Sequence, residues 1–311
     1  MSDTLQLRLV DVFADQPFAG NPAGVILDAD RLSEAQMRAV AREINASETA
    51  FISGANDIHQ PPRLRWFTPA AEVQFCGHAT LAAAHALAEV LHLPTLLAKS
   101  DARLEFSTAA GKLTLTPELS DRESGRVVWW LDMPDPGLQP DHTNPVKLAS
   151  LLGLRADEVD EGLPPMRTRD DDVILLVKRW RTLVELQPDF HELARLCRRR
   201  KIRGVCVATL ETLSDFVHVV SRFFAPAVGV PEDPVTGSVH GPLAALLTIN
   251  DLVPTAGGRA ALNCLQGQPD GRTGIVRAIV RTTPGGYRVA IGGSCHTTIR
   301  GEMLLPAETR P

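Results

Sequence analysis

The chain has 311 residues, a net charge of −5 at pH 7 and hydrophobic residues at 44% of its positions. The slight acidity argues against a nucleic-acid partner, and no apolar run approaches the roughly 18 residues that a membrane span needs. The N-terminus lacks the layout of a signal peptide, and the five cysteines show no CxxC spacing. We therefore expect a cytoplasmic protein without disulfides or structural zinc.

Alternating and β-branched residues predict the same order of elements twice along the chain. Each half is expected to run strand, helix, strand, strand, and then a helix of small residues. In the first half these elements are predicted at 23–27, 33–44, 48–54, 63–69 and from Gly77 onward. In the second half they are predicted at 172–177, 180–200, 204–210, 216–226 and from Gly237 onward. Hairpins with Gly-containing turns are expected at 103–118 and 274–293.

The two halves also match residue by residue. A set of four residues in the first half recurs 157 positions later, with Arg65, Phe67, Pro69 and Ala70 matching Arg222, Phe224, Pro226 and Ala227. Pro69 to Gly77 is 8 positions and Pro226 to Gly237 is 11, so the second copy has three extra residues. We place these extra residues at Glu232-Asp233-Pro234. A repeat of this kind predicts two pseudo-symmetric α+β domains.

The polar, turn-rich segment 117–125 is the predicted boundary between the domains. We expect domains at 1–120 and 125–311, and the last strands could pair back with the first domain. Two similar domains would face each other across a cleft, where ligands commonly bind. We therefore expect the active site in this interdomain cleft.

Each repeat ends a strand–loop stretch at a Gly that opens a helix, where backbone N–H groups and the helix dipole bind anions. Tight packing at a helix start is the plainer explanation for one copy, but two copies with polar neighbours favour a substrate site. His78 follows Gly77 directly, and Ser238 follows Gly237. Asp233 precedes the second helix and is expected to face the same site. Together these features predict a clamp for a small anionic substrate.

Cys76 precedes Gly77, where a helix N-terminus could activate a thiol as nucleophile or base. The matching residue in the second half is Thr236, so a base on each side of the substrate carbon would not be a pair of thiols. A Cys76–His78 dyad is not expected, because residues two apart at a helix start rarely point at each other. Cys76 is expected to be a small buried residue beside the site.

Four stretches together resemble the PhzF-like isomerase family of phenazine biosynthesis: VDVFADQPFAGNPAGVIL (10–27), INASETAF (44–51), FTPAAEVQFCGHATLAAA (67–84) and FAPAVGVPEDPVTGSVHGPLA (224–244). LQGQPDGR (265–272) resembles a further family segment. The resemblance implies the diaminopimelate-epimerase-like fold, in which each of two pseudo-symmetric domains wraps a mixed β-sheet or barrel around a central helix. The family's phenazine enzyme has Pro after the His and no Cys before the Gly, so FCGHAT resembles the broad, uncharacterised branch.

The resemblance implies a cofactor-independent isomerase, similar to trans-2,3-dihydro-3-hydroxyanthranilate isomerase, that moves a proton between carbons without a metal. It implies Glu48 as the acid/base, with His78 and Asp233 positioning the substrate. An exposed helix-end carboxylate is the alternative role for Glu48, and the helix dipole disfavours it. The predicted substrate-binding residues are Asn21, Cys76, Gly77, Ala79, Thr236, Gly237 and Ser238.

Two other functions stay open at this point. One is an amino-acid racemase or epimerase that uses Cys76 as a base, and the other is a non-catalytic small-molecule-binding protein of the same fold. The segment KIRGVCVATL (201–210), which matches INASETAF in the second half, carries no acid before its strand. The fold therefore does not require Glu48. A homodimer is the default expectation for such an enzyme.

Overall fold

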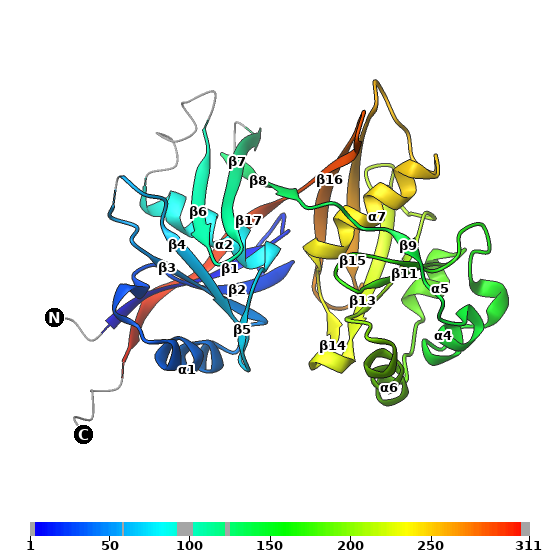
Figure 1. Ribbon diagram of the computed structural model, residues 1–311, viewed down its shortest axis with the longest axis horizontal. Coiled ribbons are helices and arrows are strands. Elements are labelled where there is room, and N and C mark those ends of the chain that lie inside the picture. The colour runs from blue at the N-terminus through cyan, green and yellow to red at the C-terminus, as the bar shows by residue number, and fades with distance from the viewer. Residues whose placement is uncertain (1–3, 58, 92–101, 122–124, 306–311) are drawn as a thin grey trace. The chain divides into compact units, whose positions relative to one another are not determined.

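The structure is a computed structural model that describes residues 4–57, 59–91, 102–121 and 125–305 (Figure 1). It has the mixed α+β class that the sequence predicts. The chain divides into two compact units, residues 1–131 with 292–311, and residues 132–291. Residues 117–121 of the predicted boundary segment belong to β7 (Gly111–Asp121), which pairs antiparallel with β8 (Arg126–Met133). Within the described residues, none of the helices combines the length and apolar character that a membrane crossing needs.

The first unit contains a closed ring of eight strands. Around the ring, each strand pairs with the next and the last pairs with the first. In ring order these are β17 (Gly286–Leu304), β1 (Thr4–Val12), β2 (Asn21–Ile26), β3 (Glu48–Ser53), β4 (Arg63–Phe67), β6 (Leu104–Thr108), β7 (Gly111–Asp121) and β8 (Arg126–Met133). The short strand β5 (Glu72–Val73) pairs with β4. The last strand of the chain, β17, thus pairs with the first strand, β1.

Helix α2 (Gly77–Val90) packs against β1, β2 and β3 and is buried along nearly its whole length. Its sequence, GHATLAAAHALAEV, is rich in alanine, and small side chains allow strands to approach a helix closely on several sides. Helix α1 (Glu34–Ile44) begins with a capping box between Ser33 and Gln36 and ends at Asn45, which adopts a left-handed conformation. The turn η1 (Ala29–Arg31) precedes it. The chain leaves α1 directly into β3.

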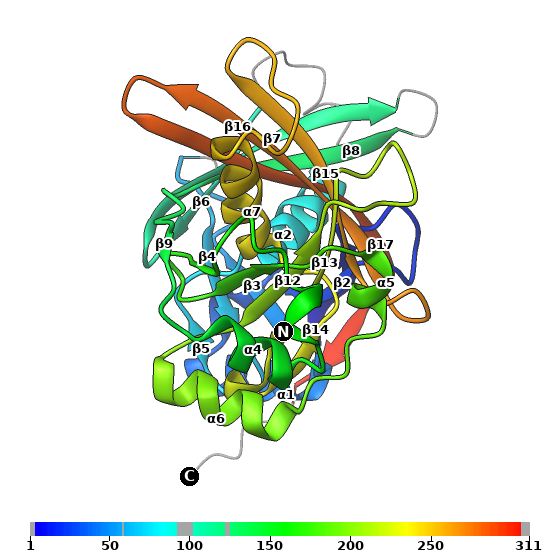
Figure 2. The same cartoon turned by 90° about the vertical axis from the view of Figure 1, so that its right-hand side faces the viewer.

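The second unit has a sheet and a buried helix of its own. Its sheet runs from β9 (Gln139–Pro140) through β10 (Met166–Arg167), β11 (Val173–Leu176), β12 (Val205–Thr209), β13 (Val219–Ala225) and β15 (Arg259–Gly267) to β16 (Thr273–Thr283), with β14 (Val230–Asp233) also on β13. Helix α7 (Gly237–Ile249) is buried and packs against β15 and β16 (Figure 2). The other helical elements are α4 (Pro145–Leu151), α5 (Trp180–Val184), α6 (Phe190–Arg200), η2 (Ala156–Glu158) and η3 (Pro226–Val228). A leucine- and valine-rich core lies among α4, α5, α6 and the sheet.

Strand register aligns the two repeats more closely than sequence alone. Ala50 lies opposite Trp66 in the β3–β4 pair, and Cys206 lies opposite Phe223 in the β12–β13 pair. The parallel pairs β2–β3 and β11–β12 also correspond. We call residues at matching places in the two repeats pseudo-equivalent. By this register Gly204 is pseudo-equivalent to Glu48, because each directly precedes the first residue that pairs with the following antiparallel strand, Val205 with Phe224 and Thr49 with Phe67.

The register also corrects the predicted position of the three extra residues. Trp66 pairs with Val73 in the first unit, and its pseudo-equivalent Phe223 pairs with Asp233 in the second. Asp233 is therefore pseudo-equivalent to Val73 and does not belong to the insertion. The extra residues fall at the end of η3, where Gly229 has a φ of +89°. A β-turn of this hand favours glycine, and sequence spacing alone could not locate it.

Candidate active site

In the first unit, polar side chains from three loops meet at the start of α2. We call them the first cluster: Asn21, Ser47, Glu48, Cys76 and His78. Asn21 begins β2, Ser47 and Glu48 open β3, and Cys76 and His78 flank the first residue of α2. Because β2 and β3 are parallel, their first residues lie at the same edge of the sheet. The fold therefore brings together residues that lie 57 positions apart in the sequence.

The imidazole of His78 is the centre of the first cluster. Its Nε2 lies 3.4 Å from Glu48 Oε2 and 3.3 Å from Ser47 Oγ. The Ser47 hydroxyl donates in turn to Asn21 Oδ1 at 3.1 Å. His78 is buried, whereas the Glu48 side chain keeps 22% of its surface exposed. Glu48 is thus open to a ligand while its neighbours are held in place.

Cys76 contacts the other nitrogen of the same imidazole, with Sγ 3.4 Å from His78 Nδ1. The expectation that Cys76 and His78 do not point at each other is wrong. Cys76 is the N-cap residue of α2 and has extended backbone angles, φ −146° and ψ 109°. Its side chain therefore does not follow the helical spacing and lies over the first turn, where His78 is the second residue. As expected, Cys76 is buried.

The first turn of α2 supplies backbone donors beside these side chains. Gly77 and Ala79 are its first and third residues, and both are buried. The Cys76 side chain does not cap the helix, so the N–H groups of this turn are available to an acceptor at the helix N-terminus. This arrangement can hold a carboxylate or a developing enolate.

In the second unit, Asp233 and Thr236 are joined in one hydrogen-bonded loop. Thr236 Oγ1 donates to Asp233 Oδ2 at 2.5 Å. The Gln266 amide spans the loop, donating from Nε2 to the Asp233 carbonyl at 2.7 Å and accepting at Oε1 from the Thr236 N–H at 2.9 Å. Gln266 is fully buried on β15. It therefore fixes the loop that leads into Gly237 and α7.

Ser238, at the start of α7, lies beside Arg203 rather than beside Asp233. Arg203 Nη2 donates to Ser238 Oγ at 2.9 Å, and its guanidinium binds both oxygens of buried Asp172. Burial raises the pKa of Asp172 to about 6, even though Arg203 favours its ionised form. By strand register Arg203 is pseudo-equivalent to Ser47, and Ser238 to His78. A contact between these two places thus occurs in both repeats, as Ser47 with His78 in the first and Arg203 with Ser238 in the second.

The predicted site residues therefore fall into two groups. Asn21, Glu48, Cys76, Gly77, His78 and Ala79 lie together in the first unit, and Asp233, Thr236, Gly237 and Ser238 lie around the start of α7 in the second. Four structural partners were not predicted: Ser47, Asp172, Arg203 and Gln266. Ser47 and Gln266 lie within the recognised stretches INASETAF and LQGQPDGR, and Arg203 matches Ser47 in the repeat, so a residue-by-residue alignment of the halves would have indicated them.

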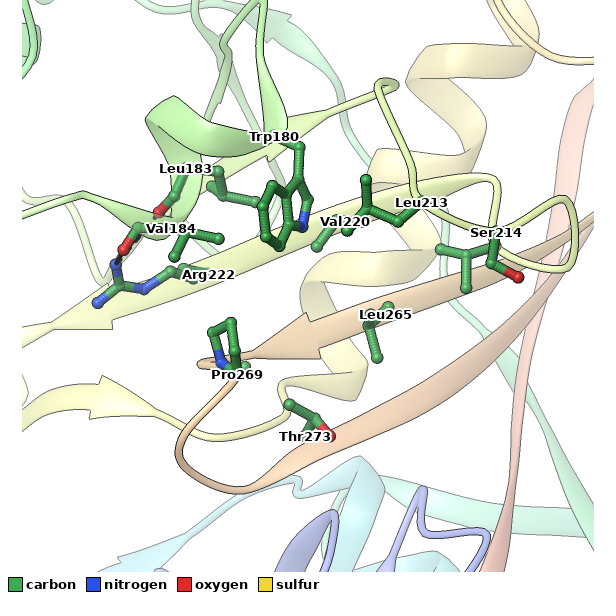
Figure 3. Close-up of a pocket in the computed structure, with 12 residues that line it drawn as sticks. Trp180, Leu183, Val184, Leu213, Ser214, Val220, Arg222, Leu265, Pro269 and Thr273 are labelled. Carbon is green, nitrogen blue, oxygen red and sulfur yellow. Dashed lines mark hydrogen bonds between the residues drawn. The ribbon is translucent and has the colours of Figure 1, made fainter.

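A separate apolar cavity of about 200 Å³ lies in the second unit (Figure 3). Its walls come from α5, the loop before β13, and strands β13, β15 and β16, with Trp180, Leu213, Val220 and Leu265 among the lining residues. Arg222 lies at one end, with its guanidinium turned to the Leu183 and Val184 carbonyls at 3.2 Å. The cavity is not lined by the predicted site residues.

Three residues of the first cluster carry atom types that can bind a metal ion. One ligand atom from each of Glu48, Cys76 and His78 lies within 4.8 Å of the others. All five cysteines are free, and burial raises the pKa of Cys197 to about 11 and of Cys264 to about 12. Among these thiols, the one at Cys76 adjoins a histidine and a carboxylate.

Solved structures of other proteins share this fold. A hydroxyproline epimerase from Agrobacterium vitis shares the fold at a TM-score of 0.59, with 12% identity over 99% of this chain and 93% of that chain. The family model "Phenazine biosynthesis-like protein" (PhzC-PhzF) matches residues 10–301. The chain belongs to this family.

Individual relatives agree over nearly the full length. An uncharacterized isomerase from Clostridium acetobutylicum is 32% identical, covering 96% of this chain and 98% of its own. The crystal structure of a PhzF-family phenazine biosynthesis protein from Bacillus anthracis superposes with a TM-score of 0.85, at 27% identity over 97% of this chain and 99% of that chain. The predicted family resemblance is therefore confirmed.

Proposed function

We propose that this protein is an isomerase that moves a proton between carbons of a small carboxylate-bearing substrate, with Glu48 as the acid/base and without a cofactor. One observation carries the proposal: the partly exposed Glu48 carboxylate lies 3.4 Å from the buried His78 imidazole at the N-terminus of α2. Membership of a family whose curated relatives are named as isomerases supports the reaction class.

In the proposed reaction, Glu48 removes a proton from a carbon activated by an adjacent π-system or carboxylate and returns it to another carbon. General acid/base groups of this kind typically contribute 10²–10⁴-fold. The negative charge that develops on the substrate is stabilised by the first-turn N–H groups of α2 and by His78. Asp233 and Ser238 are proposed to position the substrate from the second unit. A dihydroanthranilate-like ring acid is one candidate substrate.

The test is hydrogen exchange at carbon. Cyclic and linear unsaturated carboxylates are incubated with the protein in D₂O, and NMR and mass spectrometry follow deuterium entry and double-bond position. We expect one substrate class to exchange at a defined carbon. Glu48→Gln should abolish exchange while preserving binding, and Glu43→Gln, an exposed acid on α1, is the matched control. Full activity in Glu48→Gln rejects Glu48 as the base.

A racemase or epimerase that uses Cys76 is the second candidate, and the 3.4 Å contact between Cys76 Sγ and His78 Nδ1 favours it. A thiol beside an imidazole can exchange a proton with it. This candidate predicts deuterium entry with inversion at a chiral amino-acid carbon, lost in Cys76→Ser. A ligand that binds and survives unchanged across the whole panel would instead support a non-catalytic binding protein.

A further inference from the structure

We propose that Glu48, Cys76 and His78 form an inhibitory binding site for a thiophilic divalent cation of the Zn²⁺ class. The inference rests on the proposed function only in that the bound ion would block the proposed base. The binding itself rests on the geometry of the three side chains. Their donor atoms are a sulfur, an imidazole nitrogen and a carboxylate oxygen, which are the ligand types that Zn²⁺ prefers.

The distances are close to those of a metal site. Tetrahedral Zn²⁺ with bonds of 2.0–2.3 Å places its ligand atoms roughly 3.4–3.7 Å apart. Cys76 Sγ is 3.4 Å from His78 Nδ1, and Glu48 Oε2 is 3.4 Å from Nε2. The Cys76 sulfur, one His78 nitrogen and one Glu48 oxygen all lie within 4.8 Å of one another. Because the two nitrogens of one imidazole point apart, a single ion binds only one of them. The partly exposed Glu48 carboxylate would turn from Nε2 toward an ion on Nδ1 to complete the set.

The surroundings suit a bound cation. Ser47 Oγ lies 3.3 Å from His78 Nε2 and donates a hydrogen bond to Asn21 Oδ1. With a cation on Nδ1, the Nε2–H would donate to Ser47, which is the kind of outer partner that orients metal-bound histidines. The exposed side of Glu48 gives an entry path. Three protein ligands leave a fourth position open to water or a carboxylate.

Occupation of this site would oppose the proposed reaction. A cation on the Glu48 oxygen competes with the substrate proton for the same lone pair, and a cation on His78 takes away one of its donor or acceptor positions. We therefore infer that Zn²⁺ inhibits proton exchange and that a chelator restores it. Inhibition of this kind requires the Cys76 sulfur, which binds Zn²⁺ as a thiolate, so the thiol proton is released to solvent when the ion binds.

The test uses the full chain, freed of metal with a chelator, and titrates it with Co²⁺ as a spectroscopic substitute for Zn²⁺. We expect one equivalent of Co²⁺ to produce a sulfur-to-cobalt charge-transfer band and Zn²⁺ to displace it. Cys76→Ser should remove the band and weaken Zn²⁺ binding by at least roughly tenfold. Loss of an outer partner of a metal ligand already costs about 10- to 100-fold in affinity, and loss of a direct ligand should cost no less. The fold already holds a hydroxyl, Thr236, at the pseudo-equivalent position, so this variant should fold.

The matched control is His85→Gln on the same helix, where His85 Nε2 lies 3.5 Å from Glu89 without a neighbouring thiol. It should bind Co²⁺ like the wild type. The proposed site is overturned if the wild type gives no band, if Cys76→Ser keeps the band, or if His85→Gln loses it. If Cys76→Ser unfolds, Glu48→Gln is the second variant, and unchanged Zn²⁺ affinity there overturns it equally. Because the band needs no substrate, its outcome is independent of whether any carboxylate is isomerised.

Discussion

Arg222 and Glu232 form a bidentate ion pair inside the second unit, with Nε–Oε1 at 2.8 Å and Nη2–Oε2 at 2.9 Å. The guanidinium lies over the Phe224 ring at 5.1 Å. The first unit repeats the arrangement, because Arg65 pairs with Glu72 at 2.7 and 2.6 Å and lies 5.1 Å from the Phe67 ring. The pair fixes the hairpin that leads into the central helix of each repeat.

The two pairs should differ in their contribution to stability. The Arg222 side chain is 5% exposed and also donates to three backbone carbonyls, whereas Arg65 is 18% exposed. Removing one partner of a buried pair costs about 3–5 kcal/mol, and removing one near the surface costs about 1 kcal/mol or less. Urea unfolding should therefore give a much larger loss for Arg222→Met than for Arg65→Met. Equal losses would contradict the role of burial.

Gly204 has no room for a side chain. A Cβ built there would lie 2.2 Å from Phe223 Cζ, so Gly204→Ala must displace a buried aromatic ring, and overpacking of this kind costs about 1–3 kcal/mol. Gly285→Ala is the control, because nothing lies within 4 Å of the added Cβ. Thermal melts should show a lower midpoint for Gly204→Ala and little change for Gly285→Ala. A wild-type midpoint in Gly204→Ala would show that the ring moves freely.

Acid should weaken the first unit through Glu89. Burial alone would raise the pKa of Glu89, but hydrogen bonds from His85 and Arg300 outweigh it and hold the pKa at about 2 rather than the ordinary 4.5. Since the unfolded chain takes up this proton first, the stabilisation is complete above pH 4.5 and is lost as the pH falls through about 2. In Glu89→Gln, the difference in urea midpoint from the wild type should be largest near pH 6 and shrink toward pH 2. A constant difference would mean that folding does not lower the pKa of Glu89.

Ser47 should act as a positioning residue for His78. It contacts Nε2 at 3.3 Å and is itself anchored on Asn21. If the proposed reaction holds, Ser47→Ala should lower turnover by roughly ten- to a hundredfold, because small misplacements of a catalytic group are costly. The imidazole ¹⁵N shifts of His78 should change with it, which a purely structural role would not require. Ser53→Ala, at the other end of β3, is the control, and an equal effect there would reject the positioning role.

Much of the fold could be predicted from the sequence, because the residues that start and end helices lie close together in the chain. The helix over 33–44 has a capping box at Ser33 and Gln36, and the small-residue helices begin at Gly77 and Gly237 as predicted. The repeat was visible because Arg65, Phe67, Pro69 and Ala70 recur 157 positions later. Periodicity could not predict which strand closes the ring, because the β1–β17 pair joins residues almost 300 positions apart.

The candidate site was predictable only in part. Glu48 and His78 lie in recognised stretches, and the structure brings them into contact. The Cys76–His78 contact was missed because it depends on the extended N-cap conformation of Cys76, which helical spacing does not describe. Arg203 and Asp172 were missed because their ion pair joins two loops that lie 31 residues apart in the chain, directly before β12 and β11. Whether Asp233 and Ser238 act on the same substrate as Glu48 stays a prediction.

The ring of Phe223 over Gly204 has a consequence for redesign. The acid at Glu48 and the bare backbone at Gly204 occupy matching places, so transferring the acid to the other repeat looks like a single substitution. It is not, because Phe223 already fills the volume that the new side chain would need. A smaller residue would have to replace the ring before any acid could be introduced. The two repeats are therefore no longer interchangeable. Moving the acid from the first repeat to the second takes at least two substitutions, and Phe223 must be replaced first.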